Sequence, residues 1–176
     1  MNLPNKLSLL RTLCIPVLVL LMYLNTPFCH IAAVLVFCLA CLTDYFDGQI
    51  ARKKNLITDF GKFIDPLADK LLVLSVLIML IHQQMIMAWA VILILARELA
   101  VDGLRLIAVT KGKVIPAAWP GKVKTFSQMI LILYLMIFQI PVQNHWVGIV
   151  LTAWTLLITL YSGFHYFSAN RGLMGD

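Results

Sequence analysis

Four aspartates in the first half of the sequence have spacings that suit a shared site. Asp44 and Asp47 are three residues apart, and Asp65 and Asp69 are four residues apart. Because a helix turns about 100° per residue, each pair places both carboxylates on one helix face. Pro66 is suited to the first turn of the second helix. A tight connection between the two helices would therefore bring the four carboxylates together.

The chemistry of such a cluster is that of a metal site. Carboxylates at close range repel one another in a low dielectric, so they have to be protonated, paired or bound to metal. All-oxygen ligands suit hard divalent cations such as Mg²⁺ or Mn²⁺. Two such ions steady the attacking and leaving oxygens in phosphoryl transfer, so we expect two divalent ions per site. Asp59 stands alone and is more typical of a helix cap or a solvated charge.

Small residues accompany the first pair of aspartates. Gly48 and Ala51 share the helix face of Asp44 and Asp47. Because they lack bulky side chains, they would let a flat ring or a phosphate approach the backbone. Arg52 follows directly and is suited to bind a phosphate. The alternative for Gly48 and Ala51 alone is helix–helix packing, a common use of small residues in membranes.

The composition excludes the usual soluble classes. Of the 176 residues, 61% are hydrophobic and 12% are charged, and the mean hydropathy is +0.92. Soluble domains are about 45–50% apolar and about 25% charged. A membrane-spanning helix needs about 20 apolar residues. The chain therefore fits a single all-α domain over residues 1–176, a polytopic membrane protein with six transmembrane helices.

Six apolar segments follow one another along the chain. Their approximate boundaries are residues 9–24, 29–49, 66–81, 85–109, 123–140 and 145–167. Residues 110–122 contain two glycines and two prolines and are expected to form a loop. Pro4 and Asn5 could open a short interfacial helix before the first segment.

Charged residues occur on alternate connections. The connections at 25–28, 82–84 and 141–144 contain no Lys, Arg, Asp or Glu, whereas the other connections and both chain ends carry them. Basic residues concentrate on the cytoplasmic side of membrane proteins, so the pattern predicts that both termini are cytoplasmic. The net charge of +6 then reflects topology signals and contacts with anionic membrane lipids, and no nucleic acid is expected as a partner.

The aspartates and small residues belong to a longer pattern, D-x₂-D-G-x₂-A-R-x₈-G-x₃-D-x₃-D. It is made by Asp44, Asp47, Gly48, Ala51, Arg52, Gly61, Asp65 and Asp69. Through this pattern the chain resembles the CDP-alcohol phosphatidyltransferases over nearly its whole length. It is most similar to bacterial members that act on sn-glycerol 3-phosphate, in segments at 2–11, 60–72, 96–105 and 121–125. The chain departs from these bacterial members at two positions. Ser8 stands where a threonine is expected, and Asp102 stands where a small residue is expected.

The resemblance implies a fold and an activity. The fold has six transmembrane helices, a divalent-metal site and a homodimeric assembly. The activity is transfer of a phosphatidyl group from CDP-diacylglycerol to sn-glycerol 3-phosphate, which gives phosphatidylglycerol phosphate and CMP. Such a transferase of phospholipid biosynthesis is expected in the bacterial cytoplasmic (inner) membrane, as a multi-pass protein whose active site faces the cytoplasm.

The resemblance also suggests roles for the residues around the carboxylates. The expected metal ligands are Asp44, Asp47, Asp65 and Asp69. Asp69 is also expected to act as the general base that takes the proton of the acceptor hydroxyl. The residues expected to bind CDP-diacylglycerol are Gly48, Ala51, Arg52, Asn5 and Arg11.

A second set of residues is expected to bind the phosphate of the acceptor. Arg97 and Arg105 are eight residues apart and share a broad helix face, and Lys122 and Lys124 begin the next apolar segment. For the two lysines, the alternative is anchoring on the cytoplasmic side of the membrane. Asp102 could pair with Arg105 and weaken its role.

Two other functions stay open at this point. Another enzyme of the same family could use inositol phosphate, serine or phosphatidylglycerol as its acceptor, although the basic residues favour a phosphorylated one. A divalent-cation transporter also places carboxylates within the membrane. Against a transporter, the carboxylates sit toward one end and the opposite connections offer no charged residue.

Overall fold

The structure is a computed structural model that describes residues 3–24, 26–53, 59–113, 115–116 and 118–173. For residues 3–8, 44–53, 59–66 and 173, only the backbone is described. The residues so described form six α-helices and no strand, which confirms the all-α prediction. The α-helices are α1 (Leu3–Leu24), α2 (Pro27–Lys53), α3 (Asp59–His82), α4 (Ala88–Thr110), α5 (Trp119–Phe138) and α6 (Trp146–Ala169). The single-turn helices η1 (Val142–Asn144) and η2 (Arg171–Leu173) precede and follow α6.

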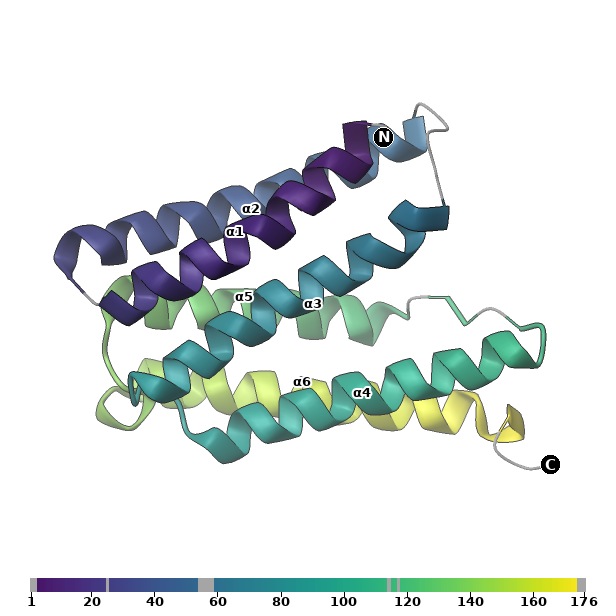
Figure 1. The fold of residues 1–176 in the computed structure, drawn as a ribbon. Helices are drawn as coiled ribbons and strands as arrows, with labels where there is room; N and C mark the ends of the chain where they lie inside the picture. Colours follow the sequence, from purple (N-terminus) through teal and green to yellow (C-terminus); the bar gives the residue numbers. More distant parts are fainter. Residues whose placement is uncertain (1–2, 25, 54–58, 114, 117, 174–176) are drawn as a thin grey trace. The chain divides into compact units, whose positions relative to one another are not determined.

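The contacts divide the chain into two compact units, of which Met1–His82 is the first. In this unit α1 packs against both α2 and α3, and Figure 1 shows α1 and α2 side by side. The core includes Leu18 of α1, Phe37 of α2 and Leu77 of α3, which are fully withdrawn from solvent. The beginning of α1, the end of α2 and the beginning of α3 lie at the same end of the unit (Figure 1).

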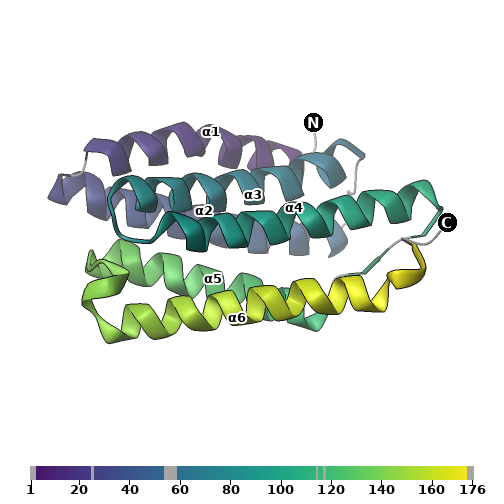
Figure 2. The same cartoon turned by 90° about the horizontal axis from the view of Figure 1, so that it is seen from below.

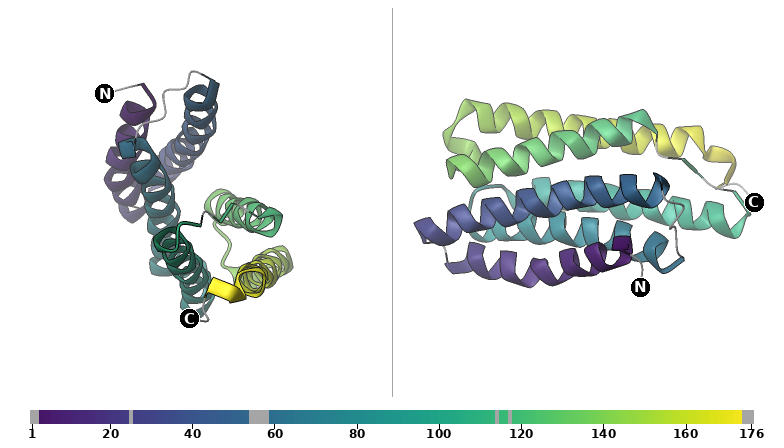
Figure 3. Two further views of the ribbon diagram at one scale, coloured as in Figure 1. Left: turned by 90° about the vertical axis from the view of Figure 1, so that its right-hand side faces the viewer. Right: turned by 90° about the horizontal axis from the view of Figure 1, so that it is seen from above.

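The second unit, Gln83–Asp176, is organised around α6. This helix packs against both α4 and α5, and Figures 2 and 3 show α5 and α6 lying side by side. The apolar core includes Ile94 of α4 and Leu131 of α5. The buried face of α6 is instead formed mainly by small and polar residues, which are Gly148, Thr152, Thr155, Thr159, Ser162, Gly163 and Tyr166. Because these residues recur at intervals that keep to one helix face, α6 presents a polar stripe to its neighbours.

Two helices of the first unit begin differently from the predictions. α1 is one continuous helix, so Pro4 and Asn5 lie in its first turns and form no separate interfacial helix. α3 begins at Asp59, so Pro66 lies inside the helix rather than at its first turn. An acidic residue is favoured at a helix N-terminus because it complements the helix dipole, and this supports the earlier start at Asp59.

The predicted loop over residues 110–122 is shorter in the structure. α5 begins at Trp119, and Pro120 lies in its first turn. A proline at this position removes no helical hydrogen bond, because the first N–H groups of a helix have no partner within the helix. α5 ends at Phe138, where Gln139 takes a left-handed conformation with φ of 51°.

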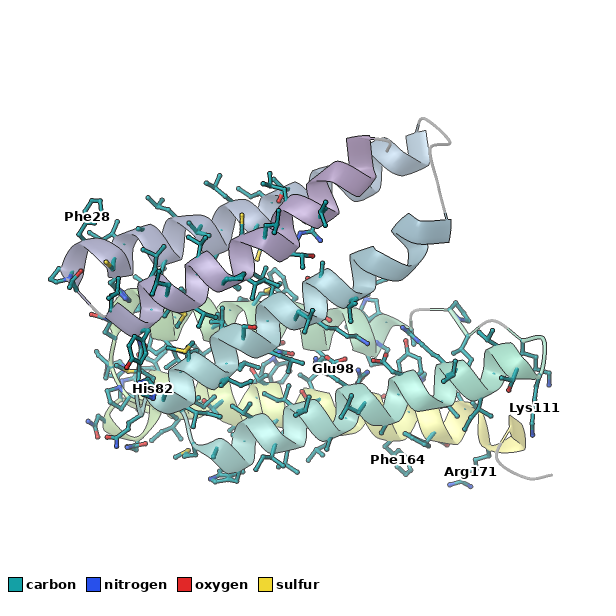
Figure 4. The ribbon with its side chains drawn as sticks, in the orientation of Figure 1. Phe28, His82, Glu98, Lys111, Phe164 and Arg171 are labelled. Carbon is teal, nitrogen blue, oxygen red and sulfur yellow. The ribbon has the colours of Figure 1, made fainter. Side chains whose placement is uncertain are left out.

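The described helices include two that are long and apolar enough to cross a membrane, α5 and α6. Shorter apolar stretches occupy Leu9–Leu24 of α1 and Pro27–Thr43 of α2. Large apolar side chains also face outward, as Figure 4 shows for Phe28, which is 81% exposed, and Phe164, which is 67% exposed. Extensive exposed apolar surface marks contact with a membrane or another protein. The six-span topology with cytoplasmic termini stays a prediction.

A hydrogen bond links two connections of the second unit, the one before α4 and the one between α5 and α6. The backbone N–H of Val142 donates a hydrogen bond of 2.9 Å to the carbonyl of Met85. A Cβ on Gly148 of α6 would lie only 3.2 Å from the Cα and 3.3 Å from the carbonyl oxygen of Val142. Because those neighbours are backbone atoms, they cannot turn aside as a flexible side chain can. The close approach of η1 to α6 therefore requires glycine at position 148.

Replacing Gly148 by alanine is expected to destabilise the second unit. The added Cβ would press on the backbone of η1, so Gly148→Ala should lower the free energy of unfolding by about 1–3 kcal/mol. Thermal unfolding of the purified protein in detergent measures the change. The matched control is Gly103→Ala in α4, where an added Cβ meets nothing within 4 Å. The control should gain roughly 0.5–1 kcal/mol from helix propensity, and equal shifts for the two variants would contradict the close contact.

Candidate functional site

Most of the residues predicted around the carboxylates belong to α2 and α3 of the first unit. The end of α2 and the beginning of α3 lie at the same end of that unit (Figure 1). Only the backbone is described for Asp44, Asp47, Gly48, Ala51 and Arg52 in α2, Asp65 in α3 and Asn5 in α1. Their assignment as metal ligands and nucleotide contacts therefore stays a prediction.

Asp69 and Arg11 are the predicted residues of the first unit whose side chains are described. Asp69 is half-buried on α3, and Arg11 on α1 is only 2% exposed. Each of them interacts with a neighbouring group. An ionised side chain withdrawn from water within apolar helices needs polar surroundings. We therefore infer that polar groups surround the buried side chain of Arg11.

The donor set expected at the metal site agrees with a divalent ion. Among the described residues, no group of three or more His, Cys, Asp or Glu could hold a metal. The predicted set consists of carboxylates alone, and Asp69 is the one member whose side chain is described. Hard cations such as Mg²⁺ and Mn²⁺ prefer oxygen ligands, whereas softer metals prefer sulfur and imidazole. The residue types thus fit Mg²⁺ or Mn²⁺.

Glu98 of α4 brings two basic residues of the second unit together. Its carboxylate forms an ion pair with the ammonium of Lys124 from α5, and it lies 3.6 Å from Nη1 of Arg97. The Lys124 side chain is only 2% exposed and the Arg97 side chain 10% exposed. Burying a lysine charge is costly unless a counter-charge is near, so Glu98 is what makes this position tolerable. Figure 4 shows Glu98 on α4.

Tyr166 of α6 contacts two arginines of α4. The Cζ atoms of Arg97 and Arg105 lie 5.5 Å and 5.3 Å from the centroid of its ring. The phenol oxygen accepts hydrogen bonds from Nη2 of Arg105 at 2.9 Å and from the backbone N–H of Ala118 at 2.7 Å. It also donates a hydrogen bond of 3.4 Å to the carbonyl of Pro116. One side chain therefore connects α4, α6 and the segment that precedes α5.

Small residues let these groups approach closely. Arg97 donates a hydrogen bond of 2.5 Å from Nη2 to Oγ of Ser162. A Cβ on Gly163 would lie 3.2 Å from Cγ of Arg97, and a Cβ on Gly121 would lie 3.4 Å from the ring of Tyr166. The aliphatic part of Arg97 therefore rests directly on the backbone of α6.

Three of the four residues predicted to bind the acceptor phosphate lie in one group. We call this group the cation cluster, and it comprises Arg97, Glu98, Arg105, Lys124 and Tyr166. The fourth predicted residue, Lys122, is exposed. Two steps along a helix rotate a side chain by about 200°, so Lys122 points away from the buried Lys124.

The cation cluster has a positive surplus and unused donors. Its three basic side chains are accompanied by a single carboxylate, Glu98, which pairs with Lys124 and Arg97, and Asp102 interacts electrostatically with Arg97. The Nε–H groups of Arg97 and Arg105 are buried and have no hydrogen-bond partner among the described residues. Buried donors without a partner are rare in folded proteins. Unused guanidinium donors with surplus positive charge are what an anion-binding site requires.

Sequence reasoning did not single out Glu98, Ser162 or Tyr166 as site residues. A signal was present for the two residues of α6, because they share a helix face with several buried threonines. Nothing in the sequence, however, indicated that this face meets α4. Glu98 follows Arg97 directly, and its pairing with a lysine of another helix depends on the tertiary fold.

Comparison with known sequences places the chain in a family. The sequence profile of the family described as CDP-alcohol phosphatidyltransferase matches residues 1–160. Because the match covers most of the chain, the protein belongs to the CDP-alcohol phosphatidyltransferase family and is an enzyme of that class. This confirms the resemblance based on the aspartate pattern. The family in general depends on a divalent metal.

Relatives are similar over almost their full lengths. The chain is 40% identical to the CDP-diacylglycerol–glycerol-3-phosphate 3-phosphatidyltransferase of Bacillus subtilis, over 96% of this chain and 95% of the relative. It is 41% identical to the protein of the same name from Rickettsia bellii, over 97% of this chain and 96% of the relative. It is also 40% identical to a probable phosphatidylglycerophosphate synthase of Mycobacterium tuberculosis, over 94% of this chain and 79% of the relative.

Neutralising Glu98 is expected to destabilise the second unit. Glu98→Gln removes the carboxylate that balances the buried Lys124, so the free energy of unfolding should fall by about 3 kcal/mol. Adding Lys124→Met to this variant removes the buried charge as well and should restore part of the loss. Chemical unfolding of the detergent-purified variants measures these values. Purely additive losses in the double variant would contradict the pairing.

The matched control for this cycle is Lys122→Met. Lys122 lies on the same helix two residues before Lys124 but is exposed. Its replacement should change the free energy of unfolding by no more than about 0.5 kcal/mol.

Proposed function

We propose that this protein is a phosphatidylglycerophosphate synthase. It transfers the phosphatidyl group of CDP-diacylglycerol to sn-glycerol 3-phosphate and forms phosphatidylglycerol phosphate and CMP. Membership of the family and the names of the relatives support the reaction. The observation that carries the acceptor assignment is the cation cluster, because its positive surplus and its two unused buried donors suit a phosphate dianion.

In this proposal the aspartates of the first unit hold two divalent ions, Mg²⁺ or Mn²⁺. The ligands are Asp44, Asp47, Asp65 and Asp69. When bound, such ions neutralise charge on the pyrophosphate and polarise its phosphorus–oxygen bonds. The chain itself contributes the spacing of the carboxylates, three residues apart on α2 and four residues apart on α3.

CDP-diacylglycerol binds beside these aspartates. Gly48 and Ala51 leave space for the cytidine nucleotide, and Arg52 contacts its phosphates. Asn5 and Arg11 of α1 complete the nucleotide site. Two observations support their participation: α1 begins at the end of the unit where α2 ends, and Arg11 is withdrawn from solvent (Figure 1).

The acceptor phosphate binds to the basic residues of the second unit. Arg97 and Arg105 supply positive charge and guanidinium donors to it. Lys124 adds positive charge from within the cluster, and the exposed Lys122 attracts the anion from solution. Positioning and charge neutralisation supply most of the rate enhancement in this kind of transfer.

Asp69 acts as the general base in the transfer step. It accepts the proton of the acceptor hydroxyl as the hydroxyl oxygen attacks the phosphorus that carries the diacylglycerol. The bond from that phosphorus to the bridging oxygen breaks, and CMP leaves with that oxygen. The half-buried position of Asp69 supports this role, because it shields the carboxylate in part from bulk water.

The lipid substrate also accounts for the apolar character of the chain. We infer six membrane spans in the bacterial inner membrane with both termini in the cytoplasm, where the soluble acceptor is present. The distribution of charge along the sequence and the two long apolar helices support this topology. We also expect a homodimer, in keeping with the family resemblance.

The acceptor is identified by measuring CMP release from CDP-diacylglycerol with a panel of acceptors. We expect release with sn-glycerol 3-phosphate and at least about a hundredfold slower release with serine or phosphatidylglycerol. Neither of these carries the phosphomonoester that would satisfy the buried donors. Faster release with inositol phosphate would change the acceptor assignment. No release with any acceptor, together with divalent-cation flux in liposomes, would favour a transporter.

Replacing the general base should separate binding from turnover. Asparagine has no carboxylate to accept a proton, so Asp69→Asn should lower kcat by at least about a hundredfold. Binding of CDP-diacylglycerol, measured by titration of the purified protein, should persist. Asp59→Asn, at the first residue of the same helix, is the control and should keep wild-type turnover. Substantial residual turnover in Asp69→Asn would refute the role of this residue as the base.

A further inference from the structure

The inner face of α6 carries three residues that the proposed reaction does not use. Ser162 and Gly163 lie four and three residues before Tyr166, so the three share one helix face. All three are buried, and each lies against an arginine of α4. They also lie beyond residue 160, where the match to the family ends. The family profile therefore does not extend to these residues, although the alignments with individual relatives cover more of the chain.

Ser162 and Gly163 hold the side chain of Arg97 at two points. Oγ of Ser162 accepts the hydrogen bond of 2.5 Å from Nη2, and the missing Cβ of Gly163 leaves the space that Cγ of Arg97 fills. A free arginine side chain has considerable rotamer entropy, which is lost when it becomes ordered. Because Arg97 is already ordered here, binding an anion does not incur that loss again.

Tyr166 holds Arg105 beside Arg97. Its hydroxyl uses every hydrogen-bonding position of a phenol, since it accepts from Arg105 and Ala118 and donates to Pro116. Its ring contacts both guanidinium groups, since the ring centroid lies 5.5 Å from Cζ of Arg97 and 5.3 Å from Cζ of Arg105. Two like charges repel each other, and the shared cation–π contact offsets part of that repulsion.

The result is a pair of fixed guanidinium groups that each retain a donor. The buried Nε–H groups of Arg97 and Arg105 have no partner among the described residues, although Nη2 of each arginine is already engaged with α6. A ligand that satisfies donors on both arginines needs several acceptor oxygens and negative charge. A phosphomonoester has both properties.

We propose that Ser162, Gly163 and Tyr166 are positioning residues that set the preference for a phosphorylated acceptor, because they hold Arg97 and Arg105 in place before the acceptor binds. This inference rests on the proposed function, in which these arginines bind the acceptor phosphate. Fixed donors bind a phosphate well and stay unpaired with an acceptor that lacks one. Leaving buried donors unpaired is how polar sites discriminate strongly between substrates.

The test uses Ser162→Ala and Tyr166→Phe, which remove one hydroxyl each and keep both arginine charges. For each variant we expect KM for sn-glycerol 3-phosphate to rise about tenfold, because hydrogen bonds to charged groups have effects of this size. We expect kcat at saturating acceptor to stay within about twofold and KM for CDP-diacylglycerol to stay unchanged. Initial rates of CMP release by the full-length protein in detergent micelles with Mg²⁺ measure all three constants.

Two controls remove hydroxyls that are also hydrogen-bonded within the second unit. Ser127→Ala removes the acceptor of a 3.0 Å hydrogen bond from the indole of Trp154. Tyr134→Phe removes a hydroxyl that lies 2.7 Å from Nδ1 of His145. Neither hydroxyl contacts an arginine in these bonds, so both variants should keep wild-type KM values whatever their thermal stability.

Calorimetric titration with sn-glycerol 3-phosphate, without CDP-diacylglycerol, separates the two proposals. Weaker binding by Ser162→Ala and Tyr166→Phe than by the wild type and the controls supports the positioning role. Wild-type affinity and KM in both variants, or equal losses in the controls, would overturn it. A wild type that binds sn-glycerol 3-phosphate but releases no CMP with it would overturn the proposed function alone. A wild type that neither binds nor uses it would overturn both.

Discussion

Lys124 and Glu98 form an ion pair between α5 and α4 in which the ammonium is almost completely withdrawn from solvent. A charge in such surroundings is stable only with a counter-charge nearby. This requirement fixes the facing sides of α4 and α5 in the second unit. On α6, Ser162 and Gly163 leave a hydrogen bond and space for Arg97, and the hydroxyl of Tyr166 accepts a hydrogen bond from Arg105.

Hydropathy predicts the order and approximate places of the six helices, although only α5 and α6 among those described are long and apolar enough to span a membrane. The ends of the helices are less predictable. Pro66 suggested a helix start, yet α3 begins at Asp59, since a favourable acidic residue at the N-terminus competes with the proline signal. Pro120 suggested a loop, yet it lies in the first turn of α5, where a proline costs nothing. The same residue types serve as loop and helix-start signals, so local sequence alone does not separate them.

Some features of the candidate site are likewise predictable from the sequence, and others are not. The shared face of Arg97 and Arg105 follows from helix geometry, and both contact one tyrosine ring. Lys122 and Lys124 look equivalent in the sequence, but one is exposed and the other buried, because they lie on different faces of α5. The contribution of Tyr166 depends on packing between helices that are distant in the chain, which no local pattern encodes. The carboxylate assignments stay predictions that rest on spacing and on family membership.

The cation cluster also has a consequence for the order of folding. α5 and α6 are joined by the short connection of residues 139–145, whereas the whole of α5 separates α4 from α6. Closing a longer loop costs more entropy, and local contacts generally form earlier. We therefore expect the α5–α6 hairpin to form first and α4 to dock last. The proposed acceptor site would then form in the final folding step, so a chain arrested earlier would be helical yet unable to bind the phosphorylated acceptor proposed for it.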